Sequence, residues 1–189
     1  GLARCTQGQW THWKAGDGLP SPMIYALLET READGPSLWV GTRGGGIGRW
    51  KAGRWSTLGM ASGLPNPSVY SLHETKTADG QALLLAGTFG GGLAWLEKDR
   101  PGAVWEVLSS QDHPDLPSNV ILCITEDVQG RLYLATPRGL VRTLPPWRGG
   151  TWRMEVFTEA DGLSSRVCSR SNLGISAEGI LRVGTRGGM

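Results

Sequence analysis

The sequence predicts an all-β chain folded as a β-propeller of four-stranded antiparallel blades, with about four blade equivalents in 189 residues. Three observations carry this prediction: a pattern repeated four times, strand and turn signals inside each copy, and small residues at one position of the first strand. A self-similar period of about 47 residues indicates identical supersecondary units that pack on one another. Each unit has room for four short strands and shows no helical period, which is typical of a propeller blade.

Two short motifs define the repeat. The first is a Gly-Leu-Pro-like corner, whose leucines are 45, 52 and 47 residues apart. The second is a Gly-Thr pair, Ala-Thr in the third copy, at intervals of 46, 48 and 49 residues. From corner leucine to threonine there are 20 to 24 residues, enough for two strands and a turn. The leucines are Leu19, Leu64, Leu116 and Leu163, and the threonines are Thr42, Thr88, Thr136 and Thr185.

Each copy contains strand signals in a fixed order. The first strand follows the corner and is rich in β-branched, aromatic and aliphatic residues. A polar turn follows, and its Asp-Gly pairs at 34–35 and 79–80 are strong hairpin signals because both residues tolerate positive φ. A second strand, the glycine-rich turn, a third strand and a tryptophan-led fourth strand complete the copy. The first strands are expected at 23–28, 68–73 and 120–125, the second at 38–42, 83–88 and 132–136, and the third at 47–50, 93–96 and 140–143.

Three side-chain positions recur in register. A tryptophan opens each fourth strand, and its regularity favours a packing role over a sugar-stacking role. A small residue occurs seven positions after the corner leucine, as expected for an innermost strand crowded on a common axis. A glutamate occurs ten positions after it, as structural residues at strand ends do. These residues are Trp10, Trp55, Trp105 and Trp152; Ala26, Ser71 and Cys123; and Glu29, Glu74 and Glu126.

Composition excludes several classes of protein. The 29 glycines and 11 prolines recur at fixed offsets, so they indicate turns and not low complexity. A net charge of +2 does not suggest nucleic-acid binding, and no apolar run approaches the roughly 18 residues of a membrane span, so we expect no direct membrane insertion by this segment. His12, His73 and His113 lie in different copies without partners at metal or triad spacing. We therefore expect no catalytic residues, no metal and no cofactor.

The third copy carries a family resemblance. It has a Leu-Pro-Ser-Asn corner at 116–119, an Ile-Thr-Glu-Asp strand end at 124–127, and a Gly-Arg-Leu-Tyr-Leu-Ala-Thr strand at 130–136. The first copy adds Leu-Trp-Val-Gly-Thr at 38–42. These strings resemble the two-component regulator propeller repeat, and the four registered copies extend the resemblance over the whole chain. The fourth copy departs from it, because it lacks the Glu-Asp pair and has Arg170 where the others have a small residue.

The resemblance implies a ligand-sensing or interaction segment of a bacterial transmembrane signalling protein, a histidine kinase, hybrid kinase or diguanylate cyclase. We expect no catalysis in this segment, a periplasmic or otherwise extracytoplasmic location within a membrane-anchored parent, contacts with the parent's other domains, and a dimer in the parent. A propeller lyase or glycosidase acting on polysaccharide is the alternative, and a purely structural docking scaffold is a third possibility. An axial cluster of His, Glu or Tyr would favour the enzyme.

The predicted blades divide the chain into five parts. These are a half blade of third and fourth strands at 1–17, whole blades at 18–62, 63–114 and 115–161, and a half blade of first and second strands at 162–189. The two halves would complete one blade, which allows either a closed four-bladed ring or an excerpt from a larger ring. We expect the excerpt, because propellers of this family usually have more blades.

A ligand site is predicted on one rim. The loop that enters the first strand and the loop that leaves the second lie on the same face of a blade. Arginine forks pair with carboxylate or sulfate, and an aromatic ring stacks on a sugar face, so the expected ligand is an anionic sugar or oligosaccharide. The alternative is that these are ordinary solvated loop residues, with glycines required by turn geometry. The expected rim and axial residues are Arg43, Phe89, Arg138, Arg186, Asn66, Asn119, Arg166 and Arg170.

Overall fold

The computed structural model describes residues 1–32, 34–98, 100–147 and 150–187, so the predicted end of the last half blade at residues 188–189 lies outside the described residues. The strands form three four-stranded and two two-stranded antiparallel sheets, in which each strand pairs with its neighbours in the chain. The predicted all-β propeller fold is therefore confirmed. Within the described residues, the helical elements are three single 3-10 turns, η1 (Ala15–Asp17), η2 (Met60–Ser62) and η3 (Glu159–Asp161).

The sheets follow one another along the chain as blades. The N-terminal half blade contains β1 (Leu2–Thr6) and β2 (Gln9–Trp13). The first blade contains β3 (Ile24–Glu32), β4 (Gly35–Thr42), β5 (Ile47–Lys51) and β6 (Arg54–Leu58). The second contains β7 (Val69–Lys76), β8 (Ala82–Thr88), β9 (Leu93–Glu97) and β10 (Glu106–Leu108). The third contains β11 (Cys123–Glu126), β12 (Leu132–Thr136), β13 (Gly139–Thr143) and β14 (Met154–Phe157). The C-terminal half blade contains β15 (Cys168–Ile175) and β16 (Leu181–Thr185).

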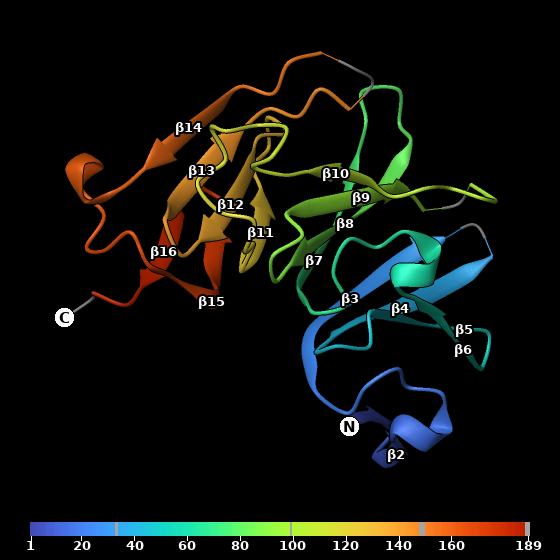
Figure 1. Ribbon diagram of the computed structural model, residues 1–189. Helices are drawn as coiled ribbons and strands as arrows, with labels where there is room; N and C mark the ends of the chain where they lie inside the picture. The colour runs from blue at the N-terminus through green and yellow to red at the C-terminus, as the bar shows by residue number, and fades with distance from the viewer. Residues whose placement is uncertain (33, 99, 148–149, 188–189) are drawn as a thin grey trace.

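The first strand of every blade lies innermost. Strand β3 contacts β7, β7 contacts β11, and β11 contacts β15, so the four strands surround a common axis. Figure 1 shows the blades as an arc with the two chain ends apart. Among the described residues the two half blades are separate two-stranded sheets and do not pair with each other. The chain therefore does not close as a four-bladed ring in this structure.

The glycine of the Gly-Thr pair allows the blades to pack closely. A Cβ at Gly41 would lie 3.0 Å from Val69 Cγ1, and one at Gly87 would lie 2.9 Å from Ile121 Cγ2. Val69 begins the inner strand of the following blade, and Ile121 lies two residues before β11. The third copy has Ala135 instead, and its cluster contains the smaller side chain of Cys168. A smaller partner on the following blade thus compensates for the larger residue on the second strand.

Tryptophans pack between blades where a blade lies on both sides. Trp105 and Trp152 are buried, in clusters that also hold the corner leucines Leu64 and Leu116. Trp10, at the same repeat position in the two-stranded half blade, is 64% exposed, and its packing role stays a prediction.

Charged side chains connect the first and second blades. The side chain of Glu32 is 1% exposed and pairs with Arg49 and Lys51 of its own blade. Burial alone would raise the pKa of Glu32, but hydrogen bonds from Lys51 and Ser37 and the charge of Arg49 bring that pKa below its usual value. Lys98 of the second blade lies 3.8 Å from the same carboxylate and pairs with Glu74.

The recurring glutamate makes a second contact between blades. Glu126 of β11 accepts a hydrogen bond from Thr75 Oγ1 at 2.8 Å, and its other oxygen lies 3.0 Å from His73 Nε2. Both partners lie on β7 of the preceding blade. Glu29, at the same repeat position of the first blade, is exposed. The structural role of this position therefore depends on which residues the neighbouring blade presents.

Candidate axial binding site

The inner strands and the glycine-rich loops enclose a cavity of about 710 Å³ at one end of the axis. Residues from the first, second and third blades and from the C-terminal half blade all line it. Its lining includes three arginines and three aromatic residues, which are Arg43, Arg170, Arg186, Tyr25, Tyr70 and Phe89.

One repeated hydrogen bond positions three of these residues. The residue after the Gly-Thr pair donates its backbone N–H to the corner loop of its own blade. The three bonds are 2.9 Å long and join Arg43 to the carbonyl of Met23, Phe89 to that of Ser68, and Arg186 to that of Val167. The third copy has Pro137 here, which has no N–H to donate. The repeat thus presents one variable side chain per blade to the cavity on a fixed backbone.

The glycine-rich loops have a structural reason for their composition. The threonine hydroxyls of Thr42, Thr88 and Thr136 donate to loop carbonyls at 2.7 to 2.9 Å. A Cβ at Gly45 would lie 2.5 Å from the carbonyl oxygen of Pro20, and the corner loop therefore requires glycine there. The alternative in which the glycines serve the loops themselves is supported at this position.

Aromatic rings from two blades form a continuous surface in the cavity. The ring centroids of Tyr25 and Tyr70 are 4.8 Å apart with an edge-to-face geometry. Those of Tyr70 and Phe89 are 5.2 Å apart. Aromatic pairs prefer these tilted arrangements, so the rings support one another's positions. They offer an apolar surface beside the arginines.

Arg170 lies across these rings from the C-terminal half blade. Its guanidinium carbon is 4.7 Å from the centroid of Tyr25 and 5.1 Å from that of Tyr70. These distances are within the range of cation–π attraction. The contacts cross the axis, because β15 packs against β11 and β12 of the third blade whereas the tyrosines lie on β3 and β7.

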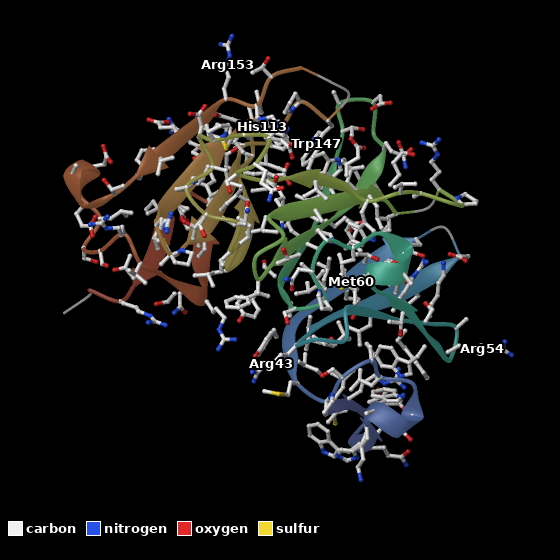
Figure 2. The ribbon with its side chains drawn as sticks, viewed as in Figure 1. Arg43, Arg54, Met60, His113, Trp147 and Arg153 are labelled. Carbon is white, nitrogen blue, oxygen red and sulfur yellow. The ribbon has the colours of Figure 1, made fainter. Side chains whose placement is uncertain are left out.

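The cavity is positively charged. Arg43, Arg170 and Arg186 line it, and none of its lining residues is an aspartate or glutamate. Within the described residues, no carboxylate lies within ion-pair distance of these three guanidiniums. Figure 2 shows Arg43 projecting from the first blade on the side away from Arg54, which lies at the blade's outer edge. Three guanidiniums near one cavity create an attractive field for an anion.

Four predicted site residues lie outside this lining, and their contact with a ligand stays a prediction. Pro137, not Arg138, occupies the cavity position of the third blade. The Asn66 side chain accepts from Ser68 N at 2.9 Å, and that of Asn119 accepts from Ser110 N at 2.7 Å, so both amides brace their loops. Arg166 lies 3.5 Å from Glu159, and both are exposed.

The axial position of the inner strands differs from the prediction. Tyr25, Tyr70 and Leu122 line the cavity, six positions after the corner leucine. The small residues at the next position face the neighbouring blade, where Ser71 Oγ accepts from Ile124 N at 3.0 Å. Tyr25 and Tyr70 are the extra residues of the bulges between Ile24 and Ala26 and between Val69 and Ser71, and a bulge redirects side chains. The sequence feature that could have identified the cavity position is the tyrosine that recurs there, as Tyr25 and Tyr70.

The alignment of Arg170 with the small residues was wrong. A Cβ at Gly184 would lie 2.4 Å from Asn172 Cβ, as one at Gly41 would lie 3.1 Å from Ala26 Cβ. Asn172 therefore occupies the small-residue position of the last half blade. Arg170 lies in a bulge of β15 between Cys168 and Leu173.

Neither a metal cluster nor an activated thiol is seen at the cavity. Within residues 1–32, 34–98, 100–147 and 150–187, no group of three His, Cys, Asp or Glu side chains could hold a metal ion. Burial raises the pKa of the Cys168 thiol, although a hydrogen bond involving the Thr136 backbone opposes this. A thiol with a raised pKa stays protonated at neutral pH and is a poor nucleophile. None of the helical turns described is long and apolar enough to cross a membrane.

Comparison with known proteins gives one family match and similar solved structures. Residues 115–138 match the sequence model of the family described as two component regulator propeller. None of the curated proteins matches the chain in sequence.

Two solved structures share the fold, and both come from B. thetaiotaomicron. One is the extracellular domain assigned to the hybrid two component system BT3049, with a TM-score of 0.74 and 16% identity over 94% of this chain and 23% of that chain. The other is the extracellular domain assigned to the hybrid two component system BT4673, with a TM-score of 0.66 and 21% identity over 95% of this chain and 22% of that chain. This chain spans less than a quarter of the length of either.

Proposed function

We propose that this chain, whose resemblance to the two-component regulator propeller repeat is confirmed at residues 115–138, is a ligand-sensing segment of a bacterial transmembrane signalling protein. The parent protein is a membrane-anchored, dimeric histidine kinase, hybrid kinase or diguanylate cyclase. The segment lies outside the cytoplasm, as the extracellular domains of similar fold do. It binds an anionic sugar or oligosaccharide and passes the signal to the other domains of the parent.

The observation that carries the proposal is that one cavity is lined by three blades and the C-terminal half blade. A ligand in it contacts the inner strands directly and so biases how the blades pack. Binding free energy shifts an equilibrium between packing arrangements only if the ligand binds one of them more tightly. A cavity made by three blades and the C-terminal half blade provides such a difference, whereas a site within one blade does not.

The lining chemistry suits binding of an acidic sugar. Arginine forms paired, planar hydrogen bonds with carboxylate and sulfate, and the Tyr25, Tyr70 and Phe89 rings offer surfaces for a sugar face. A volume of about 710 Å³ lies within the range of cavities that hold small-molecule ligands.

The close pair of Tyr25 and Tyr70 beside Arg170 also favours a second candidate, a lyase acting on acidic polysaccharide. A tyrosine can act as a general base, and an arginine can neutralise the carboxylate of a uronate. The product would contain a new carbon–carbon double bond that absorbs ultraviolet light. Incubation of the protein with polygalacturonate, with absorbance followed over time, distinguishes the lyase from the sensor.

Calorimetric titration with a panel of acidic and neutral oligosaccharides tests the sensing function. We expect at least one to bind, and the double variant Arg43→Ala/Arg186→Ala to weaken that binding at least about tenfold, the loss expected for charged hydrogen bonds. Arg54→Ala is the matched control, because it removes an exposed arginine of the β5–β6 hairpin, outside the cavity lining. Equal affinity for the double variant and the wild type, with unchanged melting temperatures, would place the site elsewhere.

A further inference from the structure

We propose that Arg170 determines the charge specificity of the axial cavity: its guanidinium, held over Tyr25 and Tyr70, is the group that recognises the anionic part of the ligand. This proposal rests on the proposed function, since it concerns the same cavity. It assigns the recognition to one residue and explains why the last half blade departs from the repeat.

The departure that delivers Arg170 is a lengthened bulge. In the first two blades the register shifts by one extra residue, between Ile24 and Ala26 and between Val69 and Ser71. In the C-terminal half blade Cys168 pairs with Thr185 and Leu173 with Val183, which leaves three extra residues. Bulges redirect side chains and occur often beside functional sites. Here the extra length places the Arg170 guanidinium over the rings on the opposite side of the axis.

The two rings hold the guanidinium and leave its hydrogen-bond donors available. The two rings are inclined at 79°, so the planar guanidinium can lie parallel to at most one of them, and those of its five in-plane N–H donors that are not directed at the other ring stay available. Within the described residues, the Arg170 guanidinium has no hydrogen-bond acceptor and no carboxylate partner. A carboxylate or sulfate that enters the cavity can therefore take two parallel N–H donors without displacing the tyrosines.

The surrounding charges favour an anion over a neutral ligand. Arg43 and Arg186 line the same cavity, and its lining contains no acidic side chain to neutralise them. A neutral sugar can accept hydrogen bonds from these cations but leaves their charge uncompensated, so part of the lost hydration is not replaced, which costs free energy. An anionic ligand replaces that hydration with charged hydrogen bonds. The sugar face is then free to lie on Tyr70 and Phe89, whose rings adjoin.

Inorganic sulfate is the probe for this site, because it carries the charge without the sugar. Sodium sulfate is titrated into the protein against sodium chloride at constant ionic strength, which removes general screening effects. The arginine side-chain and tyrosine ring signals are followed by nuclear magnetic resonance. We expect saturable shifts of the Arg170, Tyr25 and Tyr70 signals, at least about tenfold weaker sulfate binding in Arg170→Ala, and a smaller loss in Arg170→Lys, which keeps the charge but not the fork.

Ring variants and a surface control separate recognition from general charge or folding effects. Tyr25→Phe with Tyr70→Phe keeps both ring faces and should bind sulfate within about twofold of wild type, since cation–π attraction uses the face of the ring. Arg54→Ala removes one positive charge from an exposed hairpin outside the cavity and should leave binding unchanged. Melting curves of all variants verify that they are folded.

Unchanged sulfate affinity in Arg170→Ala, or no saturable shift of cavity signals in the wild type, would overturn the proposal. Its failure is distinguishable from failure of the sensing function. If neutral oligosaccharides bind and Arg43→Ala/Arg186→Ala weakens them while Arg170→Ala does not, the sensor stands and the role of Arg170 falls. If no oligosaccharide binds but sulfate does so through Arg170, the anion site stands and the sugar-sensing function falls.

Discussion

The guanidinium carbon of Arg170 lies 4.7 Å from the ring centroid of Tyr25, although Arg170 belongs to the last blade in the chain and Tyr25 to the first four-stranded one. Its second ring contact, with Tyr70 at 5.1 Å, also joins blades that are not neighbours in the arc. These contacts cross the axis, so they make the cavity sensitive to the separation of the first, second and last blades. In the function proposed above, a ligand that binds Arg170 acts on the arrangement of these blades.

Replacing Gly87 by alanine should destabilise the fold. A Cβ there would lie 2.9 Å from both Cγ2 and the carbonyl oxygen of Ile121, so the third blade would have to move. Overpacking of this kind costs about 1–3 kcal/mol of unfolding free energy, measurable by urea denaturation. Gly174→Ala is the control, because a Cβ at that strand position meets nothing within 4 Å and its φ is not positive. Equal stabilities of the two variants would contradict the close packing of blades.

Replacing Glu126 by alanine should cost about 1–2 kcal/mol of unfolding free energy, because Thr75 and His73 of the neighbouring blade lose their partner. Glu29→Ala changes the same repeat position of the first blade, where the side chain is exposed, and should stay within about 0.5 kcal/mol of wild type. Thermal and urea unfolding of both variants provide the comparison. A larger loss in Glu29→Ala than in Glu126→Ala would show that the blade contact is assigned to the wrong copy.

Asp127 should stabilise the third blade in a pH-dependent manner. Burial would raise the pKa of its carboxylate, but the backbone and side chain of Arg131 and the backbone of Gln129 lower it overall. A lowered folded pKa means that the stabilisation is complete above the unfolded value of about 3.9 and disappears as the pH falls through the folded pKa. Asp127→Asn should therefore lose about 1–3 kcal/mol at pH 7 and progressively less, relative to wild type, below about pH 4.

Urea unfolding between pH 2.5 and pH 7 measures this difference. Glu106→Gln is the control. Glu106 is exposed, so the unfolding free energy of this variant should stay close to that of the wild type at every pH. A constant difference between Asp127→Asn and wild type at every pH would contradict an ionised, hydrogen-bonded Asp127.

Much of the fold can be predicted from the sequence because each copy of the repeat contains its own turn glycines and strand-forming residues. The corner glycines Gly18, Gly63 and Gly162 all have φ between 89° and 100°, a conformation that favours glycine. Strand order and the hairpin turns follow from the same signals. Residues that depend on a neighbouring blade are less predictable: Glu126 contacts its neighbour, whereas Glu29, at the same repeat position, is exposed.

The site was only partly predictable for a related reason. The loops identify Arg43, Phe89 and Arg186, since the residue after each Gly-Thr pair has the same backbone environment. In the third copy the residue after the Ala-Thr pair is Pro137, and Arg138 is one position further along. The sequence alone does not show which of the two reaches the cavity, so Arg138 was predicted as a site residue. Arg170 is reached only through the lengthened bulge of β15, and the length of a bulge cannot be read from residue spacing within one strand. Tyr25 and Tyr70 recur in the repeat, but they lie in the cavity because each is the extra residue of a bulge, which the residue spacing does not reveal.

Mapping an acidic oligosaccharide onto the protein tests the central claim most directly. Oligogalacturonate is titrated into the isotopically labelled protein, and backbone and side-chain chemical-shift changes are followed by nuclear magnetic resonance. We predict that the largest saturable changes occur at Arg43, Tyr70, Phe89 and Arg170, around the axial cavity. Changes confined to the outer aromatic cluster of Trp95, Trp147 and Trp152, with none at the cavity, would contradict the account.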